Sequence, residues 1–234
     1  MSEYLNFKYT GLSELKETEK NLLNYNTYIV KKFVNHADNN NNILDFGAGI
    51  GTLSNIYRTL DLNAKITCLE LDKDQVQIIK DRGFKSIFHL NSSNEFDYVF
   101  TSNVLEHIED DLEALNSIFK SLKHGGGLGI FVPANEILYS NIDKKLEHFR
   151  RYSKRDLREK VISSGFEIEH LTYVDCLGFF AWGVTKILNL NMDDDNSNRL
   201  KFYDKFIWPV SRFLDLLGAK YLFGKNLILL ARKP

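Results

Sequence analysis

The stretch LDFGAGIGTLS at residues 44–54 places Gly47, Gly49 and Gly51 directly after a short apolar run and before a helix-like segment. A strand, a glycine-rich turn and a helix in this order bring a ligand against bare backbone at a helix N-terminus. The next apolar run ends nineteen residues after Gly51 in Glu70, whose carboxylate is placed to accept hydrogen bonds from ribose hydroxyls. The pattern therefore predicts a pocket for a nucleoside-containing ligand. On the glycines alone, a tight turn with a solvated Glu70 is the alternative.

Strand-like and helix-like segments alternate through the chain. Apolar runs with strand character lie at 43–46, 65–70, 86–90, 96–102 and 128–132. An N-terminal helix at 14–35 is expected to pack on the domain, and further helices are expected after Gly51, Asp72, Asp110 and Ser153. Such alternation favours an α/β fold in which helices cover both faces of a parallel sheet.

The expected helices carry local signals at their boundaries. Three side chains are spaced to accept a backbone hydrogen bond three residues on, namely Asp72, Asp110 and Ser153. Three glycines follow helical segments and suit the left-handed conformation that ends a helix, namely Gly83, Gly125 and Gly165. Apolar residues at helical spacing predict a helix face that packs in the core, formed by Leu112, Leu115, Phe119 and Leu122.

Composition limits the class of protein. The 234 residues, 44% of them hydrophobic, suffice for one main domain. The 30 basic residues nearly balance 31 acidic ones, and no basic, aromatic-interleaved stripe occurs, so nucleic acid is disfavoured as a partner. No apolar run reaches the roughly 20 residues that span a bilayer and the N-terminus does not resemble a signal peptide, so a soluble, cytoplasmic protein is expected. Cys68 and Cys176 are expected to be reduced thiols in the core.

The glycine pattern differs from the G-x-G-x-x-G fingerprint of dinucleotide-binding proteins. From Asp45 it reads D-x-G-x-G-x-G, which resembles motif I of class I S-adenosylmethionine-dependent methyltransferases. FDYVFTSNVLEHIEDD at 96–111 resembles their fourth strand and the loop after it, and LKHGGGLGIFVP at 122–133 resembles the turn into their fifth strand. Further segments resemble a bacterial subfamily of these enzymes, namely NYNTY at 24–28, YSNIDKKLEHFRRYSKRDL at 139–157 and GKNLILLARKP at 224–234.

The resemblance implies the Rossmann-like fold of class I methyltransferases, with a seven-stranded, mostly parallel sheet. It also implies S-adenosyl-L-methionine as cofactor and S-adenosyl-L-homocysteine as product. A single domain is expected, made of an N-terminal helical segment at 1–40, a cofactor-binding core at 41–175, an apolar helical insertion at 176–223 and the last strand at 224–234. The residues expected around the cofactor are Asp45, which organises the loop, Gly47, Gly49 and Gly51 at the methionine end, Glu70 at the ribose, Leu71 against the adenine, Asn91 or Ser92 at the adenine amino group, and Ser102 and Asn103 beside the sulfonium.

Methyl transfer requires an aligned acceptor and, for some acceptors, a base that removes a proton. His148 in EHFRRY is the candidate base, because a histidine titrates near neutral pH and this segment follows the fifth strand, where acceptors approach in this fold. A structural histidine is the alternative at this position. His107 in VLEHIED is interpreted as structural or site-shaping.

Arg150, Arg151 and Tyr152 are the candidate acceptor-binding residues, since guanidinium groups bind carboxylates and phosphates bidentately. The alternative is a surface turn in which neighbouring acids take up the charges, namely Asp143, Glu147 and Asp156. The acidic run at 193–195 is interpreted as a solvated loop, and no metal site is expected.

Residues 176–223 are strongly apolar and lie where many methyltransferases have only a short connection. Two helices are expected to pack back on the domain through an apolar stripe, namely Phe206, Ile207, Val210, Phe213, Leu214 and Leu217. A lid over a lipid-like acceptor, or contact with a membrane surface, is an alternative that the sequence does not favour.

The sequence therefore predicts an S-adenosylmethionine-dependent methyltransferase that acts on a small-molecule, glycan or lipid-like acceptor. An oxygen of a glycan or lipid-linked intermediate is the leading candidate, while nitrogen and carbon acceptors stay open because the fold does not fix the substrate. A non-catalytic S-adenosylmethionine-binding protein and a nicotinamide-dependent oxidoreductase are the alternatives from other classes. The sequence does not determine the oligomeric state.

Overall fold

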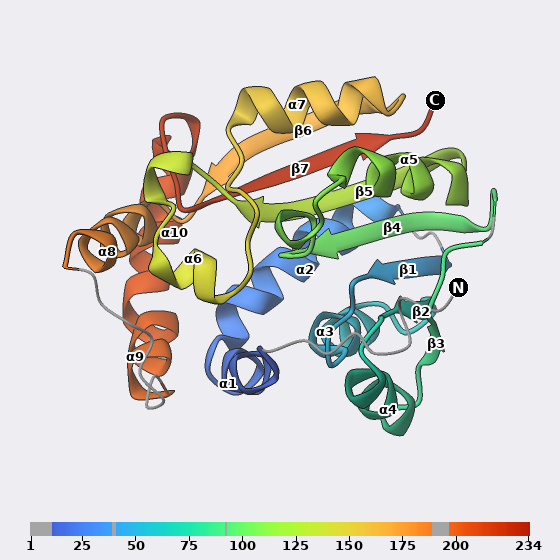
Figure 1. Cartoon of the computed structure of the whole chain (residues 1–234), viewed down its shortest axis with the longest axis horizontal. Helices are drawn as coiled ribbons and strands as arrows, with labels where there is room; N and C mark the ends of the chain where they lie inside the picture. Colours follow the sequence, from blue (N-terminus) through green and yellow to red (C-terminus); the bar gives the residue numbers. More distant parts are fainter. Residues whose placement is uncertain (1–10, 39–40, 92, 189–196) are drawn as a thin grey trace.

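A seven-stranded sheet forms the centre of the protein (Figure 1). The computed structural model describes residues 11–38, 41–91, 93–188 and 197–234. The strands are β1 (Asn42–Phe46), β2 (Lys65–Leu69), β3 (Lys85–Ile87), β4 (Phe96–Ser102), β5 (Leu122–Pro133), β6 (Glu167–Val174) and β7 (Asn226–Arg232). They lie in the order β3-β2-β1-β4-β5-β7-β6, and β7 runs antiparallel to both of its neighbours. The structure confirms the predicted α/β fold with a mostly parallel, seven-stranded sheet.

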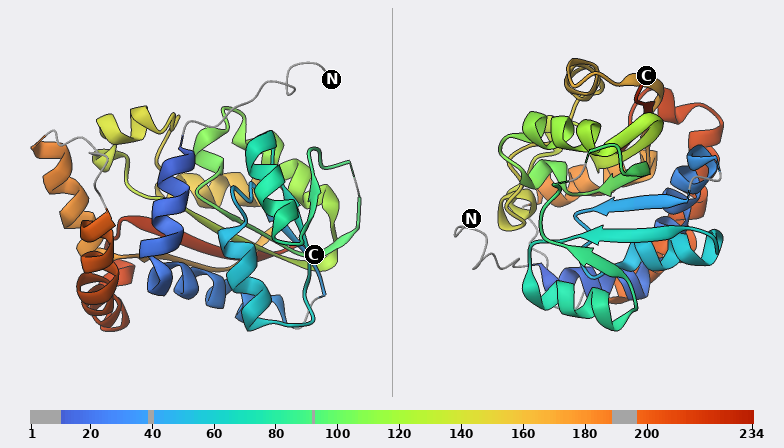
Figure 2. Two further views of the ribbon diagram at one scale, coloured as in Figure 1. Left: turned by 90° about the horizontal axis from the view of Figure 1, so that it is seen from below. Right: turned by 90° about the vertical axis from the view of Figure 1, so that its right-hand side faces the viewer.

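Helices cover both faces of this sheet (Figure 2). They are α1 (Leu12–Asn21), α2 (Leu23–Ala37), α3 (Thr52–Leu60), α4 (Lys73–Asp81), α5 (Asp111–Ser121), α6 (Asn141–Lys145), α7 (Lys154–Ser163), α8 (Cys176–Ile187), α9 (Ser197–Phe202) and α10 (Trp208–Leu216). Short turns are η2 (Leu105–His107), η3 (Glu136–Leu138), η5 (Ala219–Tyr221) and the π-helical η4 (Tyr203–Ile207). Side chains of α2, α3 and α4 form the core on one face, and those of α5 and α7 form it on the other.

Aromatic and branched side chains fill both core layers. On the α2 face, Phe33 and Tyr57 each stack with Phe100 from β4, with ring centroids 5.5 Å apart in both pairs. On the α5 face, Leu115 and Leu157 are buried against the other side of the sheet. Burial of apolar area at about 25 cal/mol per Å² is the main term that holds such layers together.

The N-terminal helix predicted at 14–35 is two helices in the structure, so this prediction was wrong. Leu22, with φ −116° and ψ 43°, leaves helical geometry between α1 and α2. The carboxylate of Asp204 in η4 then caps α2 by accepting hydrogen bonds from the amides of Asn24 at 3.0 Å and Tyr25 at 2.9 Å. The cap lies 180 residues away from Asn24 along the chain, and a local pattern therefore cannot reveal it.

The predicted helix caps are confirmed. The side chains of Asp72, Asp110 and Ser153 accept hydrogen bonds from the amides three residues on at 3.1, 2.9 and 3.0 Å. Gly83 and Gly165 follow α4 and α7 with positive φ, as predicted. Gly125 also has a positive φ of 75°, but α5 already ends at Ser121 and the glycine lies within the long strand β5.

Two further predictions need correction. Leu112 is 38% exposed, and Ile118 takes its place on the buried face of α5. The strand predicted at 86–90 is shorter and spans Lys85–Ile87. The strand 96–102 was predicted with the bounds that the structure has, and Cys68 and Cys176 are buried free thiols as expected.

The insertion between β6 and β7 packs on the domain through a face of α10 that combines one aromatic residue with two polar residues. Trp208, Ser211 and Asp215 are 3%, 0% and 1% exposed, and the Asp215 carboxylate accepts hydrogen bonds from the amides of Asp175 at 2.9 Å and Cys176 at 3.3 Å. The stripe predicted to pack inward points outward at four positions, since Phe206, Val210, Phe213 and Leu217 are each at least half exposed. No helix in the described part of the chain is long and apolar enough to cross a membrane.

Candidate functional site

The glycine loop lies at the carboxyl end of β1, where the arrowheads of β1, β4 and β5 point to the same side (Figure 1). Gly47, Gly49 and Gly51 have φ angles of 77°, 58° and 79°, which side-chain-bearing residues rarely adopt. A Cβ atom on Gly47 would overlap the methyl groups of Val104. The amides of Gly47 and Ala48 donate to the carbonyl of Leu69 at 3.0 and 2.9 Å, which ties the loop to the end of β2.

Glu70 lies against this loop at the end of β2. One carboxylate oxygen accepts from the amide of Gly49 at 2.8 Å, and the other accepts from Leu71 at 2.7 Å and Asp72 at 3.0 Å. Burial raises the pKa of Glu70, and these amide hydrogen bonds oppose that shift. The structure thus brings the predicted ribose-binding carboxylate and the predicted methionine-binding glycines together.

Asp45 connects β1 to the helix after the loop. It is 3% exposed, and its carboxylate accepts a hydrogen bond from the hydroxyl of Ser54 on α3 at 2.7 Å. Burial raises the pKa of Asp45 to about 7, although the Ser54 hydrogen bond opposes the shift. This hydrogen bond links β1 to the first turn of α3, and the role of Asp45 in organising the loop stays a prediction.

The other predicted cofactor residues follow neighbouring strands. Leu71 follows β2, and Asn91 lies in the exposed segment after β3, while Ser92 lies outside the described residues. Ser102 ends β4, and Asn103 follows it with φ 54° and donates its amide to the carbonyl of Phe131 at 2.8 Å. Because β1, β2 and β4 are parallel, these positions share one edge of the sheet with the glycine loop.

Helix α1 covers the glycine loop, which the sequence reasoning did not foresee. A methyl group of Leu15 lies 3.3 Å from the position that a Cβ on Gly49 would take. Glu19 of α1 forms a two-point ion pair with Arg82, at 2.5 and 2.9 Å, which fastens the helix beside the end of α4. Leu15 and Glu19 form no sequence motif, so the sequence alone does not indicate this contact.

His148, the candidate base, lies in the segment after α6, beyond the end of β5, and contacts the carboxylate of Asp143. Its Nδ1 is 2.9 Å from Oδ1 of Asp143, and its side chain is 9% exposed. Although burial opposes it, hydrogen bonding to His148 and the charge of Arg151 lower the pKa of Asp143 to about 2, so this carboxylate is ionised. An imidazole held by a carboxylate through Nδ1 presents Nε2 to its other neighbours.

Two residues that the sequence reasoning did not assign to chemistry lie beside His148. The rings of His107 and His148 are edge to face with centroids 4.6 Å apart. Burial, and then the charge of His148, lowers the pKa of His107 to about 4. Glu106 is fully buried, and burial raises its pKa to about 8. An acid in the middle of an otherwise apolar run, directly before a histidine, is the sequence signal that could have identified this pair.

Arg150, Arg151 and Tyr152 are paired with protein groups, as the ion-paired alternative expects. Arg151 is 5% exposed and its Nε donates to Asp143 at 2.8 Å. Arg150 lies 2.8 Å from the carboxylate of Asp111, to which the hydroxyl of the fully buried Tyr152 donates at 2.7 Å. These contacts are the ones that the ion-paired alternative describes, and a role of the three residues in acceptor binding stays a prediction.

Trp182 of α8 brings the insertion to the same edge. Its ring lies 4.8 Å from the guanidinium carbon of Arg151 and 4.9 Å from the ammonium of Lys225, which directly precedes β7. Burial lowers the pKa of Lys225. One apolar helix and two cations of the domain therefore meet beside the end of β5.

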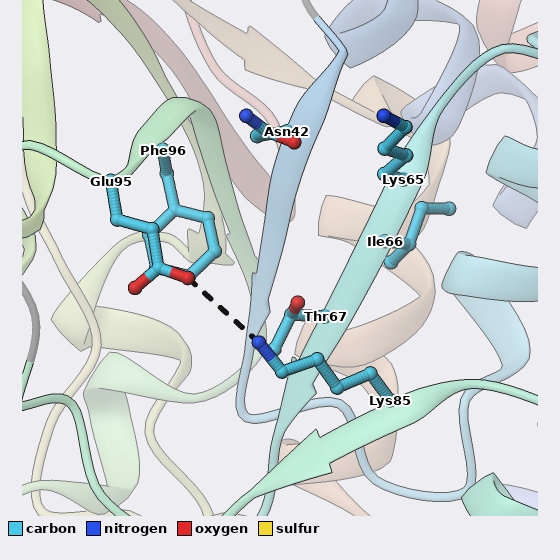
Figure 3. A pocket seen from close by; sticks show the side chains of 7 residues that line it. All are labelled: Asn42, Lys65, Ile66, Thr67, Lys85, Glu95 and Phe96. Atoms are coloured by element: carbon cyan, nitrogen blue, oxygen red, sulfur yellow. Dashed lines mark ion pairs between the residues drawn. The ribbon is translucent and has the colours of Figure 1, made fainter.

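A separate pocket lies at the opposite edge of the sheet (Figure 3). It is lined by Asn42, Lys65, Ile66, Thr67, Lys85, Glu95 and Phe96. Lys85 and Glu95 form an ion pair of 3.8 Å across it. Since these residues lie at or near the amino ends of β1 to β4, this pocket is not part of the site described above.

Comparison with known proteins gives the family. A family model for a methyltransferase domain matches residues 19–171. Malonyl-[acyl-carrier protein] O-methyltransferase 1 of Ilyobacter polytropus is 22% identical over 151 residues, which are 58% of this chain and 56% of the relative. The chain therefore matches a little over half the length of that curated relative.

Solved structures share the fold. Phosphoethanolamine N-methyltransferase 2 of Haemonchus contortus in complex with S-adenosyl-L-methionine matches 98% of this chain and 58% of its own, with TM-score 0.65 and 17% identity. A methyltransferase of Haloferax volcanii, in a complex with the Trm112 methyltransferase activator, matches 100% of this chain and 99% of its own, with TM-score 0.63 and 12% identity. Because the family model covers more than half of the residues, this chain belongs to the methyltransferase-domain family of S-adenosylmethionine-dependent enzymes.

Proposed function

We propose that this protein transfers the methyl group of S-adenosyl-L-methionine to an oxygen atom of a small acceptor, a glycan or lipid-linked intermediate. The observation that carries the proposal is one shared edge of the sheet. The glycine loop and Glu70, which together would form the cofactor cradle, lie there at the ends of β1 and β2. His148, hydrogen-bonded to the carboxylate of Asp143, lies beyond β5. The curated relative is named an O-methyltransferase, which supports oxygen as the acceptor atom. The Haemonchus contortus neighbour is named an N-methyltransferase, so a nitrogen acceptor is the second candidate.

The backbone conformation and the polar groups of this cradle support the assignment of the cofactor. The backbone of Gly47, Gly49 and Gly51 would hold the methionine end, since their positive φ angles leave it bare. Glu70 would receive the ribose hydroxyls on lone pairs beyond those that its amide hydrogen bonds use, with Leu71 at the adenine. The other residues that would surround the cofactor are Asp45, Asn91, Ser92, Ser102 and Asn103. When bound, the cofactor supplies a methyl carbon activated by a positively charged sulfur.

His148 would act on the acceptor. An oxygen acceptor must lose its proton as the new carbon–oxygen bond forms, and Asp143 orients His148 so that Nε2 is the nitrogen left to receive it. The carboxylate of Asp143 also stabilises the imidazolium that results. This arrangement resembles the support that a base receives from a carboxylate in other enzymes, but it fixes no particular acceptor.

The exposed apolar side chains of the insertion support an acceptor with a lipid part. Six residues of α8, α10 and their flanks are 60–82% exposed, namely Ile187, Leu188, Phe213, Leu216, Leu217 and Leu222. Basic residues of the insertion accompany them, namely Lys186 in α8, Lys201 in α9, Lys205 in η4, Arg212 in α10 and Lys220 in η5. Apolar and basic side chains in this combination suit contact with an anionic lipid surface, from which a lipid-linked acceptor would be drawn.

Incubation with methyl-labelled S-adenosyl-L-methionine and separated cell fractions tests this function. We expect label to enter the organic phase of a lipid extract, and not an aqueous metabolite pool. Gly49→Val, which is expected not to bind the cofactor, serves as the control for label carried over without turnover. Label that appears in the aqueous pool alone contradicts the lipid-linked acceptor, and label in neither fraction contradicts the enzyme's proposed acceptor class.

A further inference from the structure

Glu106 presents a buried carboxylate for which the described residues supply no hydrogen-bond donor. It is 0% exposed, and neither of its carboxylate oxygens has a hydrogen-bond partner. Its own backbone amide is close to the carboxylate, but not in hydrogen-bond geometry. A buried polar group left unsatisfied costs about 1–3 kcal/mol or more, so such a group requires an explanation.

Two imidazoles converge on this carboxylate. Glu106, His107 and His148 each offer one ligand atom, and these atoms lie within 4.8 Å of one another. Glu106 and His107 come from η2, whereas His148 comes from the segment after α6. The amide of Phe149 in that segment donates to the carbonyl of Glu106 at 2.8 Å and so joins the segment to η2. The cluster is therefore assembled by two separate parts of the chain that are bound to each other.

Each imidazole also has a protein group beside it that lies outside the cluster. Nδ1 of His148 is bonded to Asp143, which itself accepts from Arg151 at 2.8 Å and from the amide of Ser140 at 2.9 Å. The backbone of Leu146 and Glu147 lies close to the imidazole of His107. Metal-binding histidines commonly use one ring nitrogen in this way, bonded to a carboxylate or a carbonyl, and the other nitrogen as ligand.

We propose that Glu106, His107 and His148 bind a divalent first-row transition ion. Two imidazole nitrogens and one carboxylate oxygen suit Zn²⁺, Co²⁺ or Mn²⁺ better than Mg²⁺ or Ca²⁺, which prefer sites made of oxygens. The ion supplies the partner that the Glu106 carboxylate lacks. Arg151 also lies near this carboxylate, but Asp143 neutralises its charge.

Three protein ligands leave coordination positions open, as in catalytic metal sites. The cluster begins three residues after Asn103, the residue expected beside the sulfonium. An acceptor hydroxyl drawn to the ion would release its proton to solvent more readily, because a cation lowers the pKa of an oxygen that it binds. This consequence rests on the proposed function, and in it His148 acts as a ligand and not as the free base.

Titration of chelator-treated, full-length protein with Co²⁺, followed by visible absorption, tests the site without any turnover. We expect one equivalent to bind saturably and to be displaced by Zn²⁺. Glu106→Gln keeps the size of the side chain and is expected to weaken Co²⁺ binding by about tenfold or more. Glu109→Gln, an exposed acid on the same segment, is the matched control and is expected to bind like the wild type.

A second pair of variants keeps the test valid if Glu106→Gln does not fold. His148→Gln is expected to weaken Co²⁺ binding to a similar extent, and His124→Gln, at an exposed histidine, is expected to leave it unchanged. Absence of saturable binding, or equal affinity of the variants and the wild type, overturns the metal site. Calorimetry with S-adenosyl-L-methionine on the same samples tests the proposed function separately, since cofactor binding without Co²⁺ binding removes only the metal site.

Discussion

The carboxylate of Glu70 accepts a hydrogen bond from the amide of Gly49 at 2.8 Å, which joins the end of β2 to the glycine loop. The same carboxylate accepts from Leu71 and Asp72 through its other oxygen. The acid predicted to bind the ribose therefore also shapes the backbone predicted to bind the methionine end. Its removal affects the two halves of the cofactor site together.

Glu70→Ala is expected to weaken S-adenosyl-L-methionine binding by roughly 1–3 kcal/mol, because hydrogen bonds to a charged group are lost. Isothermal titration calorimetry measures the effect. Glu113→Ala, at an exposed acid on α5, is the control and is expected to bind the cofactor like the wild type. Equal affinities of Glu70→Ala and the control would show that Glu70 does not contribute to the site.

Gly49→Val is expected to abolish cofactor binding. At φ 58° a β-branched residue is strained, and its side chain would press against Leu15 of α1. Gly183→Ala is the matched control, since Gly183 lies in α8 with its nearest neighbour 3.9 Å from an added Cβ. Thermal denaturation of both variants, together with a cofactor titration, separates loss of binding from loss of the fold. A folded Gly49→Val protein with wild-type affinity contradicts the assignment of the loop.

His148→Ala is expected to lose turnover while it keeps cofactor affinity, because the residue lies in the segment after α6 and not in the glycine loop. Single-turnover methyl transfer and calorimetry on the same preparation measure the two properties. Near-normal turnover would return His148 to the structural alternative. Treatment of the wild type with a chelator separates the two roles of His148. Loss of turnover that Co²⁺ or Zn²⁺ restores would identify a metal ligand, whereas turnover that the chelator leaves intact fits a free base.

Asp45 is expected to make the free energy of unfolding depend on pH. Burial raises its pKa to about 7 in the folded state, whereas the unfolded chain has a value of about 3.9. The folded state thus binds more protons between these values, so the contribution of Asp45 is fully present below about pH 4 and is lost as pH rises through about 7. Urea denaturation at pH 5 and pH 8 should show a smaller difference for Asp45→Asn than for the wild type. The same difference in both proteins contradicts the raised pKa.

The insertion is expected to bind anionic lipid. In flotation with vesicles of phosphatidylcholine and phosphatidylglycerol, we expect the wild type to float and the double variant Phe213→Ser, Leu217→Ser to remain in solution, because both side chains are exposed. Leu112→Ser, at a partly exposed position on α5, is the control and should float. A wild-type protein that stays in solution contradicts lipid contact. Analytical ultracentrifugation that then shows self-association would assign the exposed apolar side chains to contact between copies of the protein.

The cofactor half of the site could be predicted because its signals are local. A strand, three glycines and a spaced acid specify the conformation of a few consecutive residues, and the strand Phe96–Ser102 contains the buried run Tyr98, Val99 and Phe100. The break at Leu22 could not be predicted, since the cap of α2 comes from Asp204. The same limit applies to Glu106 and His148, which no sequence spacing connects and which meet only because the segment after α6 binds back to η2.

The orientation of the insertion shows a different limit. Apolar residues at helical spacing predicted that α10 packs through Phe213 and Leu217, but the buried face carries Ser211 and Asp215 instead. Hydrophobic periodicity assumes that the apolar face turns inward. In α10 the polar face is satisfied by backbone amides of Asp175, Cys176 and Leu177, so the apolar face is left outside.

Calorimetric titration of the purified, cofactor-stripped protein with S-adenosyl-L-methionine, S-adenosyl-L-homocysteine and NAD tests the central claim most directly. We predict saturable binding of both sulfur nucleosides to one site and no binding of NAD. Binding of NAD in place of the sulfur nucleosides, or binding of none of the three by a folded sample, would contradict the account of the glycine loop and of the activity built on it.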